Sequence, residues 1–276
     1  MPLVLVGTPI GNLGDLSPRA IEALTAADVI CCEDTRRTGR LLQHAGIART
    51  PLIVVNDHTE RDAIDRVLER LSVGERVAVV SDAGMPGISD PGEALVRAAV
   101  DAGHPVEVVP GPSAVVTALV VSGLAAGRFV FEGFLPRKGS GRAARLGEVA
   151  VERRTVVLYE APHRLARTLS DLVEVCGAER LVAIGRELTK LHEETWRGSL
   201  GEALAWVAAQ VPRGELVIVL DGAPEAAMPS AEDIEAGLRS ELASGASARD
   251  AASVVAQRLG VPKRAAYELA VRLRST

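Results

Sequence analysis

Two kinds of hydrophobic pattern alternate along the first part of the chain. Short runs of aliphatic and β-branched residues are typical of strands, and segments with apolar residues three or four positions apart are typical of helices. The short runs predict strands at 3–6, 29–32, 52–55, 77–80 and 106–109. The periodic segments predict helices at 18–26, 35–45, 60–71 and 92–102. This alternation indicates βαβ units and a mostly parallel sheet.

A second set of elements follows the punctuating segment Pro110-Gly111-Pro112. We therefore place a domain boundary near residue 112, with one α/β domain at 1–112 and a second at 113–222. In the second domain the patterns predict strands near 129–132, 155–159, 181–185, 193–197 and 215–220. They predict helices at 113–121, from 142 onward, and at 162–175 and 200–209.

The segment 224–276 has a different, purely helical pattern. Two Ser-x-x-Asp pairs, at 230–233 and 247–250, are typical of helix starts, and Gly260-Val261-Pro262 indicates a stop followed by a new start. We expect a small helical domain of the helix-turn-helix kind. Between 249 and 274 there are six basic and two acidic residues, which leaves open both a nucleic-acid contact and a solvated helical cap.

Composition excludes some classes of protein but does not identify the function. The 276 residues correspond to roughly two domains of ~150 residues, and 47% of them are hydrophobic. The net charge of −5 and the aromatic content of 3% argue against a general nucleic-acid coat protein or a base-stacking platform. They still permit an enzyme with a local basic patch. The odd cysteine count and the absence of zinc spacing fit a reducing cytoplasm.

Three loops after predicted strands are rich in glycine and proline, at 7–15, 81–92 and 109–114. Ligands of open α/β sheets bind at the carboxyl ends of the strands, and small residues let the backbone approach a ligand closely. Asp82, in the second loop, suits a hydroxyl or a cation. The first and third loops are equally compatible with turn-rich connectors, whereas a long ordered loop at 81–92 is hard to explain as scaffold alone.

Other candidate residues lie in the second half. The loop at 133–145 carries four basic residues and no acid, which suits a phosphate ester or polyanion as well as it suits a solvated loop. The segments 158–164 and 185–190 gather carboxylates, His163 and arginines at the ends of predicted strands. Neither forms a Ser-His-Asp set or a metal-ligand set.

The ordered series of these motifs identifies a protein family more specifically than any single motif does. The series reads GTPIGNLGDLSPRA, CEDTRRTGRLL, SDAGMPGISDPG, VVPGPSA, GFLPRKG, LYEAPHRL and GRELTKLHEE. It resembles the ribosomal RNA small subunit methyltransferase I family, which belongs to the tetrapyrrole-methylase-like enzymes that use S-adenosylmethionine. The resemblance extends from residue 3 to about residue 222.

The resemblance implies 2′-O-methylation of a cytidine ribose in the decoding region of 16S rRNA. It also implies two α/β domains of the tetrapyrrole methylase type (class III S-adenosylmethionine methyltransferases), a cofactor cleft between them and a homodimer, with no metal. Tetrapyrrole methylases carry a G-x-G-P-G-type turn after the first strand, and the sequence GTPIGN at this place points to the RNA branch. The cofactor residues implied by matching motif positions are Pro9, Asp82, Ala83, Gly84, Met85, Ser113, Ala114, Tyr159, Glu160, Ala161, Glu215 and Leu216.

For the reaction, we expect Glu160 or Lys138 to assist removal of the hydroxyl proton, unless solvent suffices. The expected RNA contacts are Arg36, Arg37, Arg137, Lys138, Arg142, His163, Arg164 and Arg186. Two alternatives stay open at this point. One is a methyltransferase of the same fold acting on a small molecule or a protein side chain. The other is a nucleic-acid-binding regulator with a degenerate cofactor site.

Overall fold

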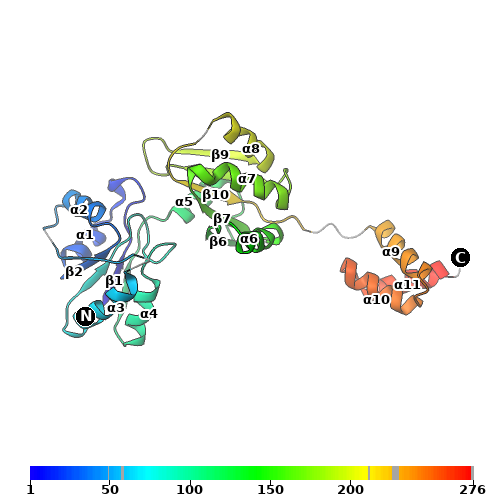
Figure 1. The fold of residues 1–276 in the computed structure, drawn as a ribbon, viewed down its shortest axis with the longest axis horizontal. Coiled ribbons are helices and arrows are strands. Elements are labelled where there is room, and N and C mark those ends of the chain that lie inside the picture. The colour runs from blue at the N-terminus through cyan, green and yellow to red at the C-terminus, as the bar shows by residue number, and fades with distance from the viewer. Residues whose placement is uncertain (49, 57–58, 211, 226–229, 275–276) are drawn as a thin grey trace. The chain divides into compact units, whose positions relative to one another are not determined.

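The computed structural model describes residues 1–48, 50–56, 59–210, 212–225 and 230–274. Its contacts divide the chain into two compact units, Met1–Ala223 and Pro224–Thr276. The first unit contains two five-stranded sheets, and the described part of the second is helical (Figure 1). None of the described helices is long and apolar enough to cross a membrane.

The first sheet is parallel, as the alternating pattern predicts. Its strand order is β3-β2-β4-β1-β5, and every pairing within it is parallel. The strands are β1 (Leu3–Val6), β2 (Val29–Cys32), β3 (Leu52–Val54), β4 (Val77–Val79) and β5 (Val106–Val109). The helices are α1 (Pro18–Thr25), α2 (Thr35–His44), α3 (Glu60–Ser72) and α4 (Glu93–Asp101), with a short 3₁₀ turn, η1 (Leu13–Asp15).

Neighbouring residues of a strand serve different cores because side chains alternate across a sheet. Cys32 packs in a cluster with α1 and α2, whereas Cys31 packs in the cluster with α3 and α4. Both faces of the sheet are therefore covered, which explains why its strands read as continuous apolar runs.

The second sheet is mixed, which the sequence pattern does not reveal. Its order is β6-β7-β10-β8-β9, and only the β6–β7 pairing is parallel. The strands are β6 (Phe129–Phe134), β7 (Thr155–Glu160), β8 (Leu181–Arg186), β9 (Glu194–Ser199) and β10 (Leu216–Leu220). The core on one face includes residues of α6 (Ser140–Val151), α7 (Pro162–Cys176) and α8 (Leu200–Ala209). The core on the other face includes residues of α5 (Ala114–Ser122).

Strand order decides which loops meet. In the first sheet β1 lies between β4 and β5, so the loops after these three strands start at one edge. In the second sheet β10 runs antiparallel to both neighbours, so Leu216 at its start pairs with Glu160 and with Arg186 at the ends of β7 and β8. Ile10, from the loop after β1, joins the core between α5 and the second sheet. The two edges therefore share packing.

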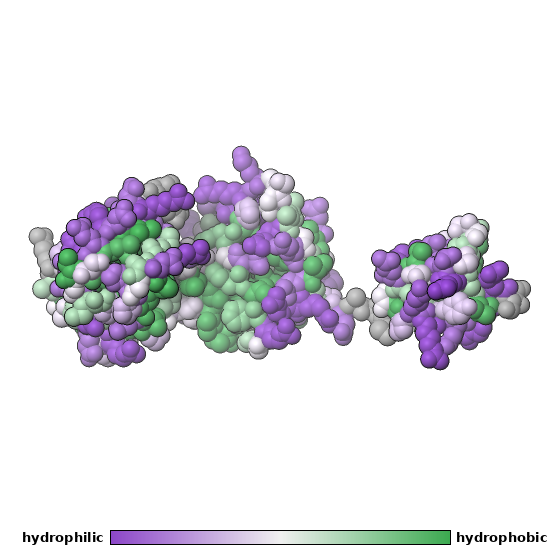
Figure 2. All heavy atoms as spheres, turned by 90° about the horizontal axis from the view of Figure 1, so that it is seen from below, coloured by the Kyte–Doolittle hydropathy of each residue, from purple (hydrophilic) through white to green (hydrophobic). Residues whose placement is uncertain are grey.

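The second unit has its own core. It consists of α9 (Ala231–Ala243), α10 (Ala248–Leu259) and α11 (Lys263–Arg274), packed around Leu238, Ala251 and Val255. Gly260 adopts a left-handed conformation (φ 66°) and ends α10, as the stop signal predicts. On the face seen in Figure 2, hydrophilic residues cover most of this unit, with small hydrophobic areas between them. Residues 226–229 and 275–276 of the predicted helical domain lie outside the described residues.

The loops that follow β1 and β5 are in direct main-chain contact at two glycines, Gly7 and Gly111. A Cβ added to Gly111 would lie 2.7–2.8 Å from backbone atoms of Gly7, and one added to Gly7 would lie 2.6 Å from Gly111. No side chain fits there without moving the main chain. These glycines set how closely the two loops approach.

We predict that Gly111→Ala lowers the free energy of unfolding by about 1–3 kcal/mol, because overpacking displaces main chain here. Urea unfolding measures this change. The matched control is Gly147→Ala on α6, where an added Cβ meets nothing within 4 Å. This control is expected to leave stability unchanged or to raise it by about 0.5–1 kcal/mol. Equal stability of the two variants would contradict the packing argument.

Candidate functional site

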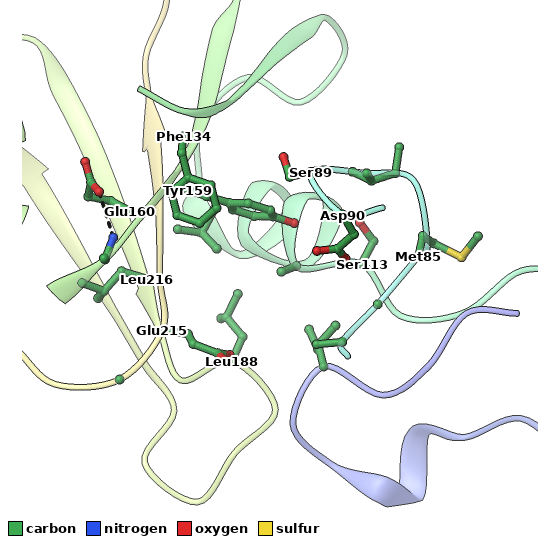
Figure 3. A pocket seen from close by; sticks show the side chains of 18 of the residues that line it. Met85, Ser89, Asp90, Ser113, Phe134, Tyr159, Glu160, Leu188, Glu215 and Leu216 are labelled. Atoms are coloured by element: carbon green, nitrogen blue, oxygen red, sulfur yellow. Dashed lines mark hydrogen bonds between the residues drawn. The ribbon is translucent and has the colours of Figure 1, made fainter. Parts of the chain in front are cut away.

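A cavity of about 320 Å³ lies where the loops of the two sheets meet in the first unit (Figure 3). We call it the first pocket. Ten of the twelve residues expected to bind the cofactor line it: Ala83, Gly84, Met85, Ser113, Ala114, Tyr159, Glu160, Ala161, Glu215 and Leu216. Sequence reasoning did not select nine further lining residues, Ile10, Ile88, Ser89, Asp90, Phe134, Pro162, Leu188, Gly214 and Val217. Most of these stand within or beside the same motifs.

The loop after β4 forms one wall, and Thr8 ties it to the loop after β1. The Thr8 N–H donates to the Gly84 carbonyl at 2.9 Å, and the Gly84 N–H donates back to the Thr8 carbonyl at 3.2 Å. Gly84 is in the left-handed region (φ 86°), and a Cβ there would meet Ile10 at 3.3 Å. The backbone therefore turns close to the cavity where a side chain would narrow it.

Aromatic rings from the second sheet form the opposite wall. The Tyr159 ring lies 5.5 Å from that of Phe134 and 4.9 Å from that of Phe131. In Figure 3 the Tyr159 ring points from its strand toward Asp90 and Ser113. Burial, reinforced by nearby carboxylates, raises the pKa of Tyr159 to about 12. The phenol is thus protonated throughout the physiological pH range and contributes a neutral hydroxyl.

The Glu160 carboxylate is enclosed, and in Figure 3 it points away from the cavity. It accepts from the Thr168 hydroxyl at 2.5 Å and the Ala161 N–H at 2.9 Å, and the Arg164 guanidinium lies 3.2 Å away. Only 1% of its side chain is exposed. These contacts favour a structural role for Glu160 over the proton transfer expected from the sequence.

Arg142 is buried within the first unit. Its side chain is 5% exposed and pairs with Asp171 at 2.7 Å. It also donates to the Thr168 hydroxyl at 2.9 Å and to the Pro136 carbonyl at 3.0 Å. These contacts favour a structural role for Arg142 over the RNA contact expected from the sequence, because its donors bind the protein interior. Arg142 anchors the loop after β6 to α7.

A second pocket of about 390 Å³ adjoins the first. The two share Ile10, Ala83 and Glu215 in their linings. Pro9 and Asp82, expected to bind the cofactor, line this second pocket and not the first. Its other lining residues are Thr8, Gly11, Leu13, Arg37, Thr38, Arg40, Leu41, Ser81 and Lys190.

The boundary between the pockets carries a charged cluster. Lys190 Nζ lies 2.8 Å from Glu187 Oε1 and 2.9 Å from Glu215 Oε2. Burial alone opposes the charge on Lys190, but its hydrogen bonds to the two carboxylates outweigh burial and raise its pKa. The hydrogen bond from Lys190 in turn lowers the pKa of Glu187. Lys190 and Glu187 are therefore both ionised at neutral pH.

The remaining basic residues expected at an RNA surface differ in exposure. Arg36 is 86% exposed and pairs with Asp34, and Arg37 is 59% exposed at the second pocket. Arg137, Lys138 and His163 are exposed but do not line either pocket. Arg164 and Arg186 are held more closely: Arg164 donates to the Leu135 carbonyl, and Arg186 pairs with Glu194 at 3.0 Å.

Comparison with known proteins identifies the family. The family model for Tetrapyrrole (Corrin/Porphyrin) Methylases matches residues 2–204. The ribosomal RNA small subunit methyltransferase I of Synechocystis sp. is 47% identical over 273 residues, 98% of this chain and 98% of that protein. The Mycobacterium tuberculosis protein of the same name is 47% identical over 275 residues, 99% of this chain and 95% of that protein. The chain belongs to the ribosomal RNA small subunit methyltransferase I family.

The fold comparison agrees with this family. The crystal structure of uroporphyrin-III C-methyltransferase from Thermus thermophilus complexed with S-adenyl homocysteine matches with a TM-score of 0.57. Sequence identity is 21%, over 79% of this chain and 97% of that chain. The resemblance to ribosomal RNA small subunit methyltransferase I and the tetrapyrrole methylase fold, both expected from the motifs, are thus confirmed.

The environment of Glu160 yields a paired test of its role. Glu160→Gln leaves one acceptor oxygen for two donors, the Thr168 hydroxyl and the Ala161 N–H, whereas Thr168→Val removes the hydroxyl that donates at 2.5 Å. Only the first variant removes the carboxylate. If Glu160 is structural, both variants lose about 1–3 kcal/mol of stability, because each leaves buried polar groups unsatisfied. Turnover by the folded protein then falls to a similar extent in both. Urea unfolding and methyl-transfer rates measure these effects.

The opposite pattern would contradict the structural role. In that case Glu160→Gln would be as stable as wild type and would lose turnover, while Thr168→Val would keep turnover. A proton-transfer role predicts this separation, because the Thr168 variant retains the carboxylate.

Proposed function

We propose that this chain methylates the ribose 2′-hydroxyl of a cytidine in the decoding region of 16S rRNA, with S-adenosylmethionine as methyl donor. The observation that carries the proposal is near-full-length similarity to proteins named ribosomal RNA small subunit methyltransferase I. The site supports it, because the motifs that carried the resemblance converge on one cavity. The alternatives with a small-molecule substrate or a degenerate cofactor site have no comparable support.

The first pocket fits S-adenosylmethionine in size and chemistry. A volume of about 320 Å³ lies within the range of small-molecule sites. Leu188, Leu216 and Val217 offer apolar surface for the adenine, and Asp90 and Ser113 offer polar groups for the ribose and the amino acid. Positive φ favours glycine at Gly84 and Gly214, so neither residue projects a side chain at these two points of the lining.

The chemistry places a modest demand on the protein. S-adenosylmethionine supplies a methyl group on a positively charged sulfur, which is reactive without a metal. The residues of the chain must then align the acceptor oxygen with that methyl group and exclude competing orientations. A weakly acidic hydroxyl also has to lose its proton. Of the two residues proposed to assist, Glu160 is buried and Lys138 lines neither pocket, which favours solvent as the proton acceptor.

The RNA surface is proposed to follow exposed cations on both halves. Arg36 and Arg37 lie at the start of α2, and Arg137, Lys138 and His163 lie near the start of α6 and α7. These side chains suit phosphate contacts, which position RNA and make its binding depend on salt. The net charge of −5 limits indiscriminate RNA binding elsewhere on the molecule.

We also propose that the protein acts as a homodimer in the cytoplasm. Val116 and Val120 on α5 are 50% and 65% exposed, although the opposite face of this helix is buried in the core of the second sheet. Val108 on the edge strand β5 is 53% exposed. Apolar side chains exposed on a helix and a sheet edge suit contact with a second copy. Light scattering of the purified protein tests this assembly.

Methyl transfer to purified small ribosomal subunits tests the function. Subunits that lack endogenous ribose methylation are incubated with S-adenosylmethionine labelled in its methyl group, and nucleosides are analysed by mass spectrometry. We expect label in 2′-O-methylcytidine. Label on another nucleoside would overturn the cytidine assignment, and cofactor binding without any label on RNA would overturn the substrate class.

Charge reversal in the basic loop tests the RNA surface. For Arg137→Glu combined with Lys138→Glu we predict a KM for small subunits at least about tenfold higher and a salt dependence of binding reduced by about two phosphate contacts. Binding titrations at several salt concentrations measure both. Arg97→Glu on α4, an exposed residue that lines neither of the two pockets, is a single charge-reversal control. If subunit affinity changes equally in both variants, the proposed surface is wrong.

A further inference from the structure

The turn between β8 and β9 forms part of the wall of both pockets. Leu188 lines the first pocket and Lys190, two residues later, lines the second. Glu215, which contacts Lys190, lines both. The turn thus lies between the place proposed for the methyl donor and the adjoining cavity.

The backbone of this turn is held in an unusual conformation. Glu187 (φ 50°) and Thr189 (φ 66°) both lie in the left-handed region, although neither is glycine. Such conformations persist only where neighbouring contacts impose them, and they concentrate at functional sites. Here the Thr189 N–H donates to Glu193 at 2.6 Å, and the Glu187 carboxylate accepts from the Glu215 N–H at 2.9 Å. These bonds fix the position of the lysine that follows.

The Lys190 ammonium is held in place but does not use all of its hydrogen-bond donors on the described residues. An ammonium group has three donors, and two of them bind Glu187 and Glu215. The side chain is 26% exposed and borders the second pocket, so one donor is left for an oxygen placed there. A lysine held in this way differs from a mobile surface lysine, because its position is set before a ligand arrives.

The loop after β1 leaves room for the Lys190 side chain at Gly11. A Cβ on Gly11 would lie 2.4 Å from Lys190 Cγ, so glycine at this position lets the side chain pass. The same Cβ would lie 3.0 Å from Thr189 Oγ1, a buried hydroxyl that makes no hydrogen bond to the described residues. Polar groups of the turn therefore face the loop after β1 at the mouth of the second pocket.

We propose that the second pocket binds the nucleotide to be methylated and that Lys190 holds it by donating to an oxygen of its sugar–phosphate. This inference rests on the proposed function and adds the location of the acceptor and the residue that positions it. A methyl acceptor must lie beside the donor, and the second pocket shares three lining residues with the first.

The charge of the pocket fits a phosphodiester. Three cations line it, Arg37, Arg40 and Lys190, against the carboxylates of Asp82 and Glu215. Arg37 and Asp82 pair with each other at 3.4 Å, and Lys190 is shared between two carboxylates. Arg40 is exposed and makes no ion pair to any residue that the structure describes. Arg40 is therefore a second cation that can contact phosphate.

The test separates acceptor binding from cofactor binding in the full-length protein. Lys190→Gln and, separately, Arg40→Gln are compared with Arg97→Gln, which removes one positive charge from α4. Calorimetry measures S-adenosylhomocysteine affinity, and titration measures affinity for small subunits in its presence. For Lys190→Gln we expect subunit affinity about ten- to hundredfold weaker, because a charge-assisted hydrogen bond is lost. For Arg40→Gln we expect it several-fold weaker. Cofactor affinity is expected to stay within about twofold of wild type.

A purely structural role for Lys190 predicts a different pattern. Glu215 and the turn would shift, so cofactor affinity would fall together with subunit affinity, and Lys190→Arg would restore both. Unchanged subunit affinity in both the Lys190 and the Arg40 variants would equally overturn the proposal. A wild-type protein that transfers no methyl group to RNA would instead refute the proposed function, so the two failures are distinguishable.

Discussion

The close contact between Gly11 and Lys190 is the constraint on which the two-pocket arrangement depends. It joins the loop after β1 to the turn after β8, which belong to different sheets. A side chain at residue 11 would occupy the space of the lysine stem. Because the lysine passes there, its ammonium reaches Glu187 and Glu215, and Glu215 in turn borders both pockets. One tight contact thus lies in the wall between the pockets proposed for the methyl donor and the acceptor.

The degree of burial distinguishes two groups of charged residues that the sequence alone does not tell apart. Arg142 and Glu160 are enclosed and bind partners within the protein, so they hold the loop after β6 and the end of β7 in place. Arg36 and Arg37, on the surface of α2, keep exposed guanidinium groups. The enclosed residues shape the site, and the exposed arginines can contact a polyanion. This division lets an acidic protein carry a basic surface without burying unpaired charge.

The sequence predicts what is local and misses what depends on distant partners. Hydrophobic periodicity predicts the parallel first sheet, because each βαβ unit is encoded in a continuous stretch. It does not predict that β10 inserts antiparallel between β7 and β8, since strand order depends on contacts far apart in the chain. The motifs predict most of the first pocket, but they do not show that Asp82 faces the second. They also do not show that Arg142 binds Asp171, because this partner lies 29 residues away.

The central claim is that donor and acceptor occupy two adjoining pockets divided by Lys190. The most direct measurement is a crystal structure of the protein with S-adenosylhomocysteine and an RNA fragment that contains the acceptor cytidine. We predict the cofactor product in the first pocket and the cytidine sugar–phosphate in the second, within hydrogen-bonding distance of Lys190 Nζ. An acceptor nucleotide bound outside the second pocket, with Lys190 contacting only Glu187 and Glu215, would contradict it.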